Sequence, residues 1–209
     1  GHGFHRSSFY DDGSGFSGFG GFGGHGSAGF DQKGQDLNAS VSVTFDEAAF
    51  GCDKRITLQD QSGKAQTLEV HIPAGIDSGK SIRLRGKGMP GTGKGVAGDL
   101  LLKVTVQPKA GYERKGMDVY TTVSIPYTTA VFGGEARVHT LYGDVMCKIK
   151  EGTQSGSKIR LRGKGIVSMK DANVHGDQYV TVQIQVPRHL NAEARQKLME
   201  YKKAAAGGR

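Results

Sequence analysis

The stretch SGKSIRLRGKG at residues 78–88 returns almost unchanged as SGSKIRLRGKG at residues 155–165. In both copies apolar residues alternate with basic ones, and this period of two is typical of a β-strand. Glycines follow each alternating run, as expected of a turn. A match of this length within one chain indicates a duplicated unit and predicts that both copies fold alike.

The likeness extends well beyond this stretch. Residues 36–55 align without gaps on residues 118–137, so that Phe50-Gly51 falls on Phe132-Gly133. Apolar and polar residues alternate through much of both copies, with turn residues between the runs. We therefore predict a mainly β protein made of two tandem homologous β-sandwich-like domains with short helices.

Composition divides the chain further. Phenylalanines near the start are separated by glycine and serine, and isolated aromatic residues in such a segment cannot form a core. After Pro187 the apolar spacing becomes three and four, and Asn191 is a suitable helix N-cap. The predicted parts are a flexible Gly/Phe-rich arm, a first β domain, a second β domain and a C-terminal helix, at residues 1–35, 36–109, 110–188 and 189–209.

Charge and cysteine content limit the classes of function. The formal net charge is +8, and the two cysteines, Cys52 and Cys147, form no CxxC pair. We expect both to be structural thiols in a reducing, cytoplasmic setting, with no disulfide framework. No apolar run is long enough to cross a bilayer, so we expect no membrane contact. The seven histidines are not at metal-ligand spacing, and we expect no cofactor, no metal and no enzymatic activity.

Residues 74–81, AGIDSGKS, approach a phosphate-binding loop. Such a loop requires a strand before it and a helix after it, so that helix N–H groups face the phosphates. Here Pro73 precedes the loop, and an alternating strand pattern follows it. We interpret the segment as a turn. The basic turns at residues 85–88 and 162–165 could contact phosphate, but no aromatic platform for bases accompanies them in the sequence, which favours solvated charges.

The order of these parts resembles the DnaJ family of co-chaperones, and particular residues match. Residues 45–51, FDEAAFG, resemble the family's short helix after the first strand, and residues 72–79, IPAGIDSG, its "IPAG" turn. Residues 98–100, GDL, resemble its strand start. Residues 111–118, GYERKGMD, are similar to its domain junction, with tyrosine in place of phenylalanine and without the usual histidine. The chain contains neither the His-Pro-Asp tripeptide of the J-domain nor the CxxCxGxG repeats of the zinc module.

The resemblance implies that the chain binds unfolded or misfolded polypeptide clients and passes them to a DnaK-type chaperone. It also implies a homodimer formed through the C-terminal region. Lys54 becomes a candidate contact for the acidic tail of the partner chaperone, although a solvated lysine is the simpler interpretation. By position, the resemblance assigns an apolar client groove to the first domain, lined by Ala39, Val41, Ile56, Leu58 and Tyr112.

Alternation alone does not separate a groove from a core, and apolar faces are usually buried. The second copy offers a comparison, because Thr121 aligns with Ala39 and Thr140 with Leu58. Core positions should stay apolar in both copies, whereas a groove can lose its function in one of them. The difference favours a groove in the first domain, while a core role stays open.

Other hypotheses remain at this point. The basic charge is also compatible with a nucleic-acid-binding module, which a steep salt dependence of DNA binding would support. A dimeric scaffold without a client site is a third class. The phenylalanines of the arm resemble client side chains, so a segment such as residues 16–22 could itself occupy the groove.

Overall fold

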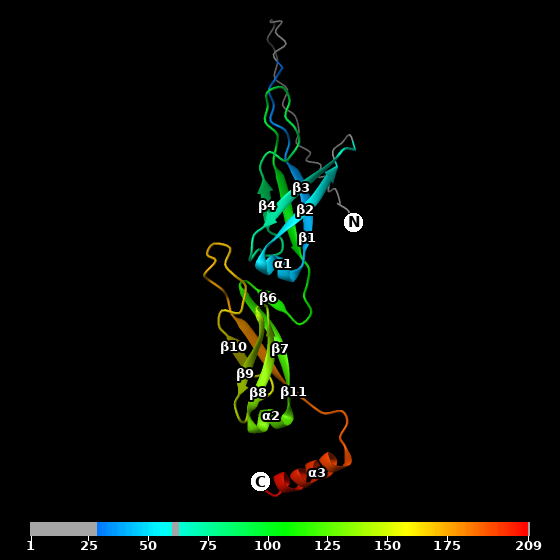
Figure 1. Ribbon diagram of the computed structural model, residues 1–209, viewed down its shortest axis with the longest axis vertical. Helices are drawn as coiled ribbons and strands as arrows, with labels where there is room; N and C mark the ends of the chain where they lie inside the picture. Colours follow the sequence, from blue (N-terminus) through cyan, green and yellow to red (C-terminus); the bar gives the residue numbers. More distant parts are fainter. Residues whose placement is uncertain (1–28, 60–62, 209) are drawn as a thin grey trace, which may run out of the picture. The chain divides into compact units, whose positions relative to one another are not determined.

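The computed structural model describes residues 29–59 and 63–208. The chain divides at Lys109 and Ala110 into two compact units (Figure 1). Each unit combines an open sheet with a separate two-stranded hairpin, and the prediction of a mainly β fold with short helices is confirmed. Within the described residues, none of the helices has both the length and the apolar composition needed to cross a membrane.

The first unit contains five strands and one short helix. A three-stranded sheet has the order β1-β5-β4, and β2 and β3 form a hairpin of their own. Strand β1 runs parallel to β5, with Val41 opposite Val104, whereas the other pairs are antiparallel. The elements are β1 (Leu37–Val43), α1 (Phe45–Phe50), β2 (Cys52–Gln59), β3 (Ala65–Ile72), β4 (Ser81–Leu84) and β5 (Leu100–Val106).

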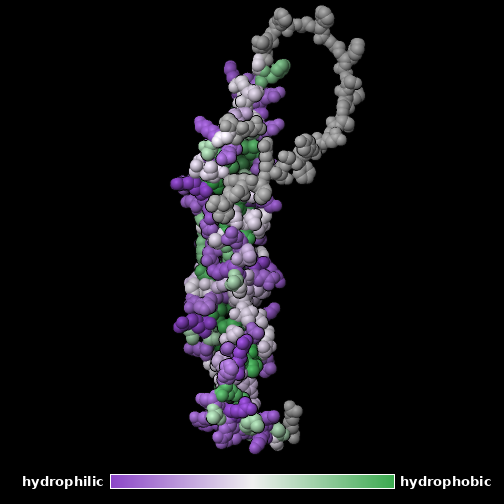
Figure 2. All heavy atoms as spheres, turned by 90° about the vertical axis from the view of Figure 1, so that its right-hand side faces the viewer, coloured by the Kyte–Doolittle hydropathy of each residue, from purple (hydrophilic) through white to green (hydrophobic). Residues whose placement is uncertain are grey.

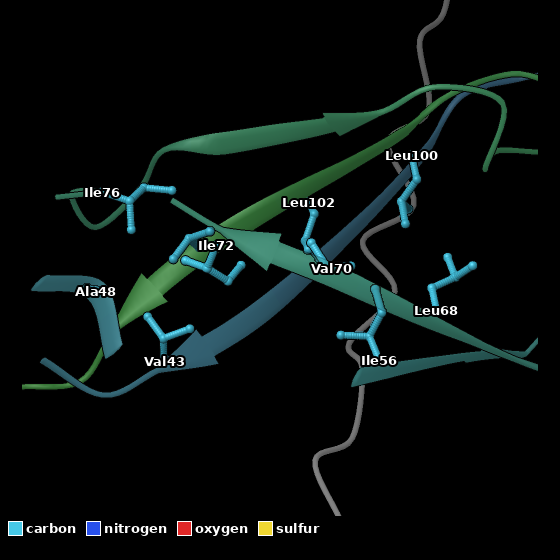
Figure 3. Packing of buried hydrophobic residues seen from close by; sticks show 10 residues of the cluster. Val43, Ala48, Ile56, Leu68, Val70, Ile72, Ile76, Leu100 and Leu102 are labelled. Atoms are coloured by element: carbon cyan, nitrogen blue, oxygen red, sulfur yellow. The ribbon is translucent and has the colours of Figure 1, made fainter. Parts of the chain in front are cut away.

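The core of the first unit lies between this sheet and this hairpin. Figure 3 shows side chains from both layers pointing toward one another, with Ala48 of α1 closing one end. Leu100, Leu102 and Val104 of the central strand β5 are completely buried. Burial of large aliphatic side chains at this level contributes roughly 1.5–3 kcal/mol each, which makes β5 the most firmly held strand of the unit.

The second unit repeats this architecture. Its sheet has the order β10-β11-β7-β6, with β7 parallel to β11, and β8 and β9 form the hairpin. A C-terminal helix with Asn191 as its N-cap follows, as predicted. The elements are β6 (Glu113–Lys115), β7 (Asp118–Pro126), α2 (Tyr127–Phe132), β8 (Gly134–Thr140), β9 (Gly143–Ile149), β10 (Lys158–Leu161), β11 (Gln178–Gln185) and α3 (Ala192–Ala206).

The repeated RGKG turn has a structural role in the first unit. Gly86 has a φ of +71°, which favours glycine, and its N–H donates a hydrogen bond of 3.0 Å to the Asp99 carboxylate. This bond lowers the pKa of Asp99 below its ordinary value. Gly88 packs so closely on Gly98 that an added Cβ would lie 2.6 Å from the Gly98 carbonyl carbon. The turn therefore holds the start of β5.

The second unit contains the same arrangement. Gly163 also has a φ of +71°, and its N–H donates a hydrogen bond of 2.9 Å to Asp177. An added Cβ on Gly165 would lie 2.5 Å from the carbonyl carbon of Gly176. The interpretation of residues 74–81 as a turn rather than a phosphate loop is supported, because they follow β3 and lead into the strand β4 and not into a helix.

The end of the predicted flexible arm differs from expectation. Residues 32–35 are held against residues 88–98 by main-chain hydrogen bonds, including Gly34 N–H to the Val96 carbonyl at 2.8 Å and Met89 N–H to the Gln35 carbonyl at 2.9 Å. The arm was expected to extend to residue 35 because its glycines give no periodic pattern. Residues 1–28, with the hypothesis that residues 16–22 occupy the groove, lie outside the described residues.

Candidate functional site

A stripe of half-buried apolar side chains follows the inner face of β1 and the end of β2 in the first unit. Ala39 and Val41 of β1 and Leu58 of β2 pack against the core but keep part of their surface exposed. By contrast, Leu100 and Leu102 of the neighbouring strand β5 are completely buried. Ile82 and Leu84 of the other edge strand, β4, are half-buried as well, so partly exposed apolar surface follows the outer strands and not the central strand β5.

Both strands beside this stripe have a free edge within the described part of the chain. Strand β1 pairs only with β5, and β2 pairs only with β3. An edge strand presents main-chain N–H and C=O groups on its unpaired side. Apolar surface next to free main-chain groups can hold an extended peptide, because the edge supplies hydrogen bonds and the side chains supply apolar contact.

The five predicted groove residues are not equivalent. Ala39, Val41 and Leu58 form the half-buried stripe, whereas Ile56 is only 5 % exposed and belongs to the core. Tyr112 is half-buried and belongs to the second unit. The stripe that the structure describes in the first unit is thus narrower than the expected groove.

Lys54, the predicted contact for a partner chaperone, lies on β2 and forms an ion pair of 2.9 Å with Glu47 of α1. Glu47 also accepts the N–H of Thr44, while the Thr44 hydroxyl accepts the N–H of Glu47. The Thr44 main-chain bond, followed by Lys54, lowers the pKa of Glu47. Burial, reinforced by Glu47, raises the pKa of the nearby Cys52 thiol. Lys54 is therefore paired with Glu47, which belongs to the N-terminal cap of α1, and is not fully solvated.

The second unit differs at the equivalent positions. Thr140 is buried and its hydroxyl is used within its own turn, donating to the Gly143 carbonyl at 2.6 Å. Thr121 accepts a hydrogen bond from Gln178, a fully buried residue that the sequence reasoning missed. A signal for it was present, because Gln178 follows Gly-Asp in the second copy where Leu100 does in the first.

A row of basic and aromatic side chains crosses four strands of the second sheet. The rings of Tyr120 and Tyr179 stack at 5.3 Å, the Lys115 ammonium lies 5.0 Å from Tyr120, and the Arg160 guanidinium lies 6.0 Å from Tyr179. These residues occupy β6, β7, β11 and β10 in turn, so each tyrosine ring lies between two neighbours. The stacked rings and the cations beside them stabilise this sheet surface.

Large hydrophobic side chains are also exposed outside the stripe, among them Phe50, Val96, Phe132 and Val186. Figure 2 shows hydrophobic atoms only in small patches between hydrophilic side chains on the face it displays. Over residues 29–59 and 63–208, histidine, cysteine and acidic side chains do not gather in groups of three or more that could hold a metal ion. The half-buried stripe of the first unit combines apolar surface with free strand edges, and we take it as the candidate site.

Comparison with known proteins gives a consistent result. The model of the DnaJ C terminal domain matches residues 37–187. The chain is 45 % identical over 142 residues to "Chaperone protein DnaJ" of Lachnospira eligens, covering 68 % of this chain and 38 % of that protein. It is also 45 % identical over 145 residues to "Chaperone protein DnaJ" of Burkholderia pseudomallei and of Burkholderia thailandensis, covering 69 % of this chain and 38 % of each relative. The chain thus spans little more than a third of the length of these relatives.

Proposed function

We propose, from the premise that this chain belongs to the DnaJ C-terminal domain family, that its first unit binds extended segments of unfolded polypeptides. The observation that supports this most directly is the half-buried stripe of Ala39, Val41 and Leu58 beside two free strand edges. A client segment would add to an edge as a further strand and place its apolar side chains on the stripe.

A site of this size binds weakly. A large apolar side chain that is fully buried contributes roughly 1.5–3 kcal/mol, and these three residues offer only their remaining exposed surface. We propose that a homodimer formed through α3 adds avidity, because two linked sites engage one chain with a raised effective concentration. Leu198, Met199 and Tyr201 of α3 are between 44 % and 51 % exposed, which leaves apolar surface for a second copy.

Transfer of the client to a DnaK-type chaperone is the second part of the proposal. An acidic tail of that partner would compete with Glu47 for Lys54, since the Lys54–Glu47 ion pair is partly exposed and so only weakly stabilising. We place this exchange in the cytoplasm, where the thiols of Cys52 and Cys147 stay reduced.

Affinity for a permanently unfolded protein tests the proposal. Reduced, carboxymethylated α-lactalbumin carrying a fluorophore is titrated with the full chain, and binding is followed by anisotropy. The double variant Val41→Asp/Leu58→Asp puts two carboxylates into the stripe. We expect affinity to fall about tenfold or more, equivalent to about 1.4 kcal/mol, because a client would have to bury charge against apolar side chains.

The matched control is Ser40→Asp/Thr57→Asp. These residues are exposed neighbours on the same strands with side chains on the opposite face, and the control adds the same charge. The control should bind the client as the unmodified chain does. Equal affinity of the stripe variant and the unmodified chain would refute the proposed site.

A further inference from the structure

One polar side chain lies beside the second unit's counterpart of the stripe and bonds to Thr121, which aligns with Ala39. Gln178 opens β11 as Leu100 opens β5, and both side chains are completely buried. In the first unit a buried leucine at this place completes an apolar layer. In the second unit an amide is buried at the same place, which is costly unless its polar atoms are satisfied.

The amide of Gln178 joins two strands that share no sheet. Its Nε2 donates to the Thr121 hydroxyl oxygen of β7 at 2.9 Å and to the His139 main-chain carbonyl of β8 at 2.9 Å. Because a carbonyl only accepts, the nitrogen must be the atom that faces His139, and the orientation of the amide is fixed. The other end of the amide, Oε1, is buried without a hydrogen-bond partner among the described residues.

Further contacts hold the same hairpin. The Tyr142 N–H donates to the Thr140 hydroxyl at 3.0 Å, and the Tyr142 hydroxyl donates to the Gly165 carbonyl at 2.6 Å. The turn of the β8–β9 hairpin is thereby tied to the RGKG turn of its unit. Together with Gln178, these bonds fix β8 against the sheet at the end that corresponds to Leu58 in the first unit.

The first unit lacks the groups for such a tie. Leu100 has no donor, and Ala39 has no hydroxyl to receive one. Among the described residues of the first unit, Leu100 and Ala39 therefore cannot form this tie between β1 and β2, and Leu58 stays half-buried where its counterpart Thr140 is buried.

We infer that Gln178 is a specificity-determining residue that seals the second unit against strand-adding polypeptides, so that client binding is confined to the first unit. The seal takes the His139 carbonyl, a main-chain acceptor of β8, and ties β8 to β7 through a fixed amide. The inference rests on the proposed function.

Removing the tie is the direct test. The double substitution Gln178→Leu/Thr121→Ala gives the second unit the residues that the first unit has at these two positions. It is introduced into the chain that already has Val41→Asp/Leu58→Asp. Labelled carboxymethylated α-lactalbumin is again the probe. We expect client binding to recover by about tenfold over the stripe variant, comparable to the loss which that variant causes.

The reciprocal variant places the seal in the first unit. Leu100→Gln/Ala39→Thr in the otherwise unmodified chain should weaken client binding by a similar factor, with circular dichroism confirming that the first unit stays folded. This reciprocal variant tests the role of Gln178 if the variant with the opened second unit does not fold. If the reciprocal variant does not fold either, the single variant Gln178→Leu is used, and hydrogen exchange of residues 136–140 is measured. The proposed role of Gln178 requires faster exchange at these residues than in the unmodified chain.

The outcomes separate the two proposals. Undiminished binding by the stripe variant overturns the proposed function. Loss of binding by the stripe variant, with no recovery on opening the second unit and no loss on sealing the first, leaves the proposed function in place and overturns the role of Gln178. Recovery or reciprocal loss supports the seal.

Discussion

Replacing Gly165 by alanine should destabilise the second unit far more than replacing its neighbour Gly163. A Cβ on Gly165 would lie 2.5 Å from the carbonyl carbon of Gly176 and 2.6 Å from the main-chain nitrogen of Asp177. These are main-chain atoms and cannot rotate away as a side chain would. A Cβ on Gly163 meets nothing within 4 Å, so only its positive φ opposes the substitution.

The magnitudes follow from these contacts. Overpacking costs about 1–3 kcal/mol. The shift that relieves it endangers two hydrogen bonds, Gly165 N–H to Gly176 and Ile166 N–H to Met117, each contributing about 0.5–1.5 kcal/mol. We therefore expect Gly165→Ala to lower the free energy of unfolding by about 4 kcal/mol. Gly163→Ala should lower it by only about 1–2 kcal/mol, the cost of a left-handed residue.

Urea unfolding followed by tyrosine fluorescence measures this difference. The chain has no tryptophan, and six of its seven tyrosines lie between residues 112 and 201, so the signal reports on the second unit. Equal destabilisation by the two substitutions would refute the reasoning, because it would mean that main-chain crowding at Gly165 is relieved at no cost. Gly88→Ala in the first unit should leave this tyrosine transition unchanged.

Three further predictions concern the first unit. Leu102→Ala should destabilise it by about 3–5 kcal/mol, because the side chain is completely buried, and calorimetry would detect the lowered transition. Thr44→Ala should cost about 1 kcal/mol through loss of the α1 cap, seen as faster hydrogen exchange in residues 45–50, whereas Thr44→Ser should retain the protection. Because folding lowers the pKa of Glu47, its stabilising contribution is present above the unfolded value near 4.5 and is lost as pH falls through the lower folded value. In the Glu47→Gln variant the free energy of unfolding should therefore fall less between neutral and acidic pH than in the unmodified chain. Denaturation curves recorded at successive pH values measure this difference.

Much of the fold followed from local pattern. Alternation placed β1 and β3, and the spacing after Asn191 placed α3, because periodicity records which face is buried. The contacts of residues 32–35, at the end of the predicted arm, could not be predicted from the local pattern. Their main-chain bonds to residues 88–98 depend on glycines that let two backbones approach, and glycine content alone does not say what approaches.

The site was harder to predict than the fold. Ile56 and Leu58 have the same place in the alternation of β2, yet one is core and the other half-exposed, because exposure depends on what the opposite layer covers. Comparison of the copies directed attention to Thr121 and Thr140. It missed Gln178, although this residue follows Gly-Asp in the second copy at the place that Leu100 has in the first.

The seal in the second unit also has a genetic consequence. Leucine and glutamine have codons that differ by a point mutation, and so do alanine and threonine. Two of the residue pairs that distinguish the units at this level, Leu100 with Gln178 and Ala39 with Thr121, are therefore mutational neighbours. Once the ancestral unit had been duplicated, either copy could have been closed or reopened without passing through a different fold.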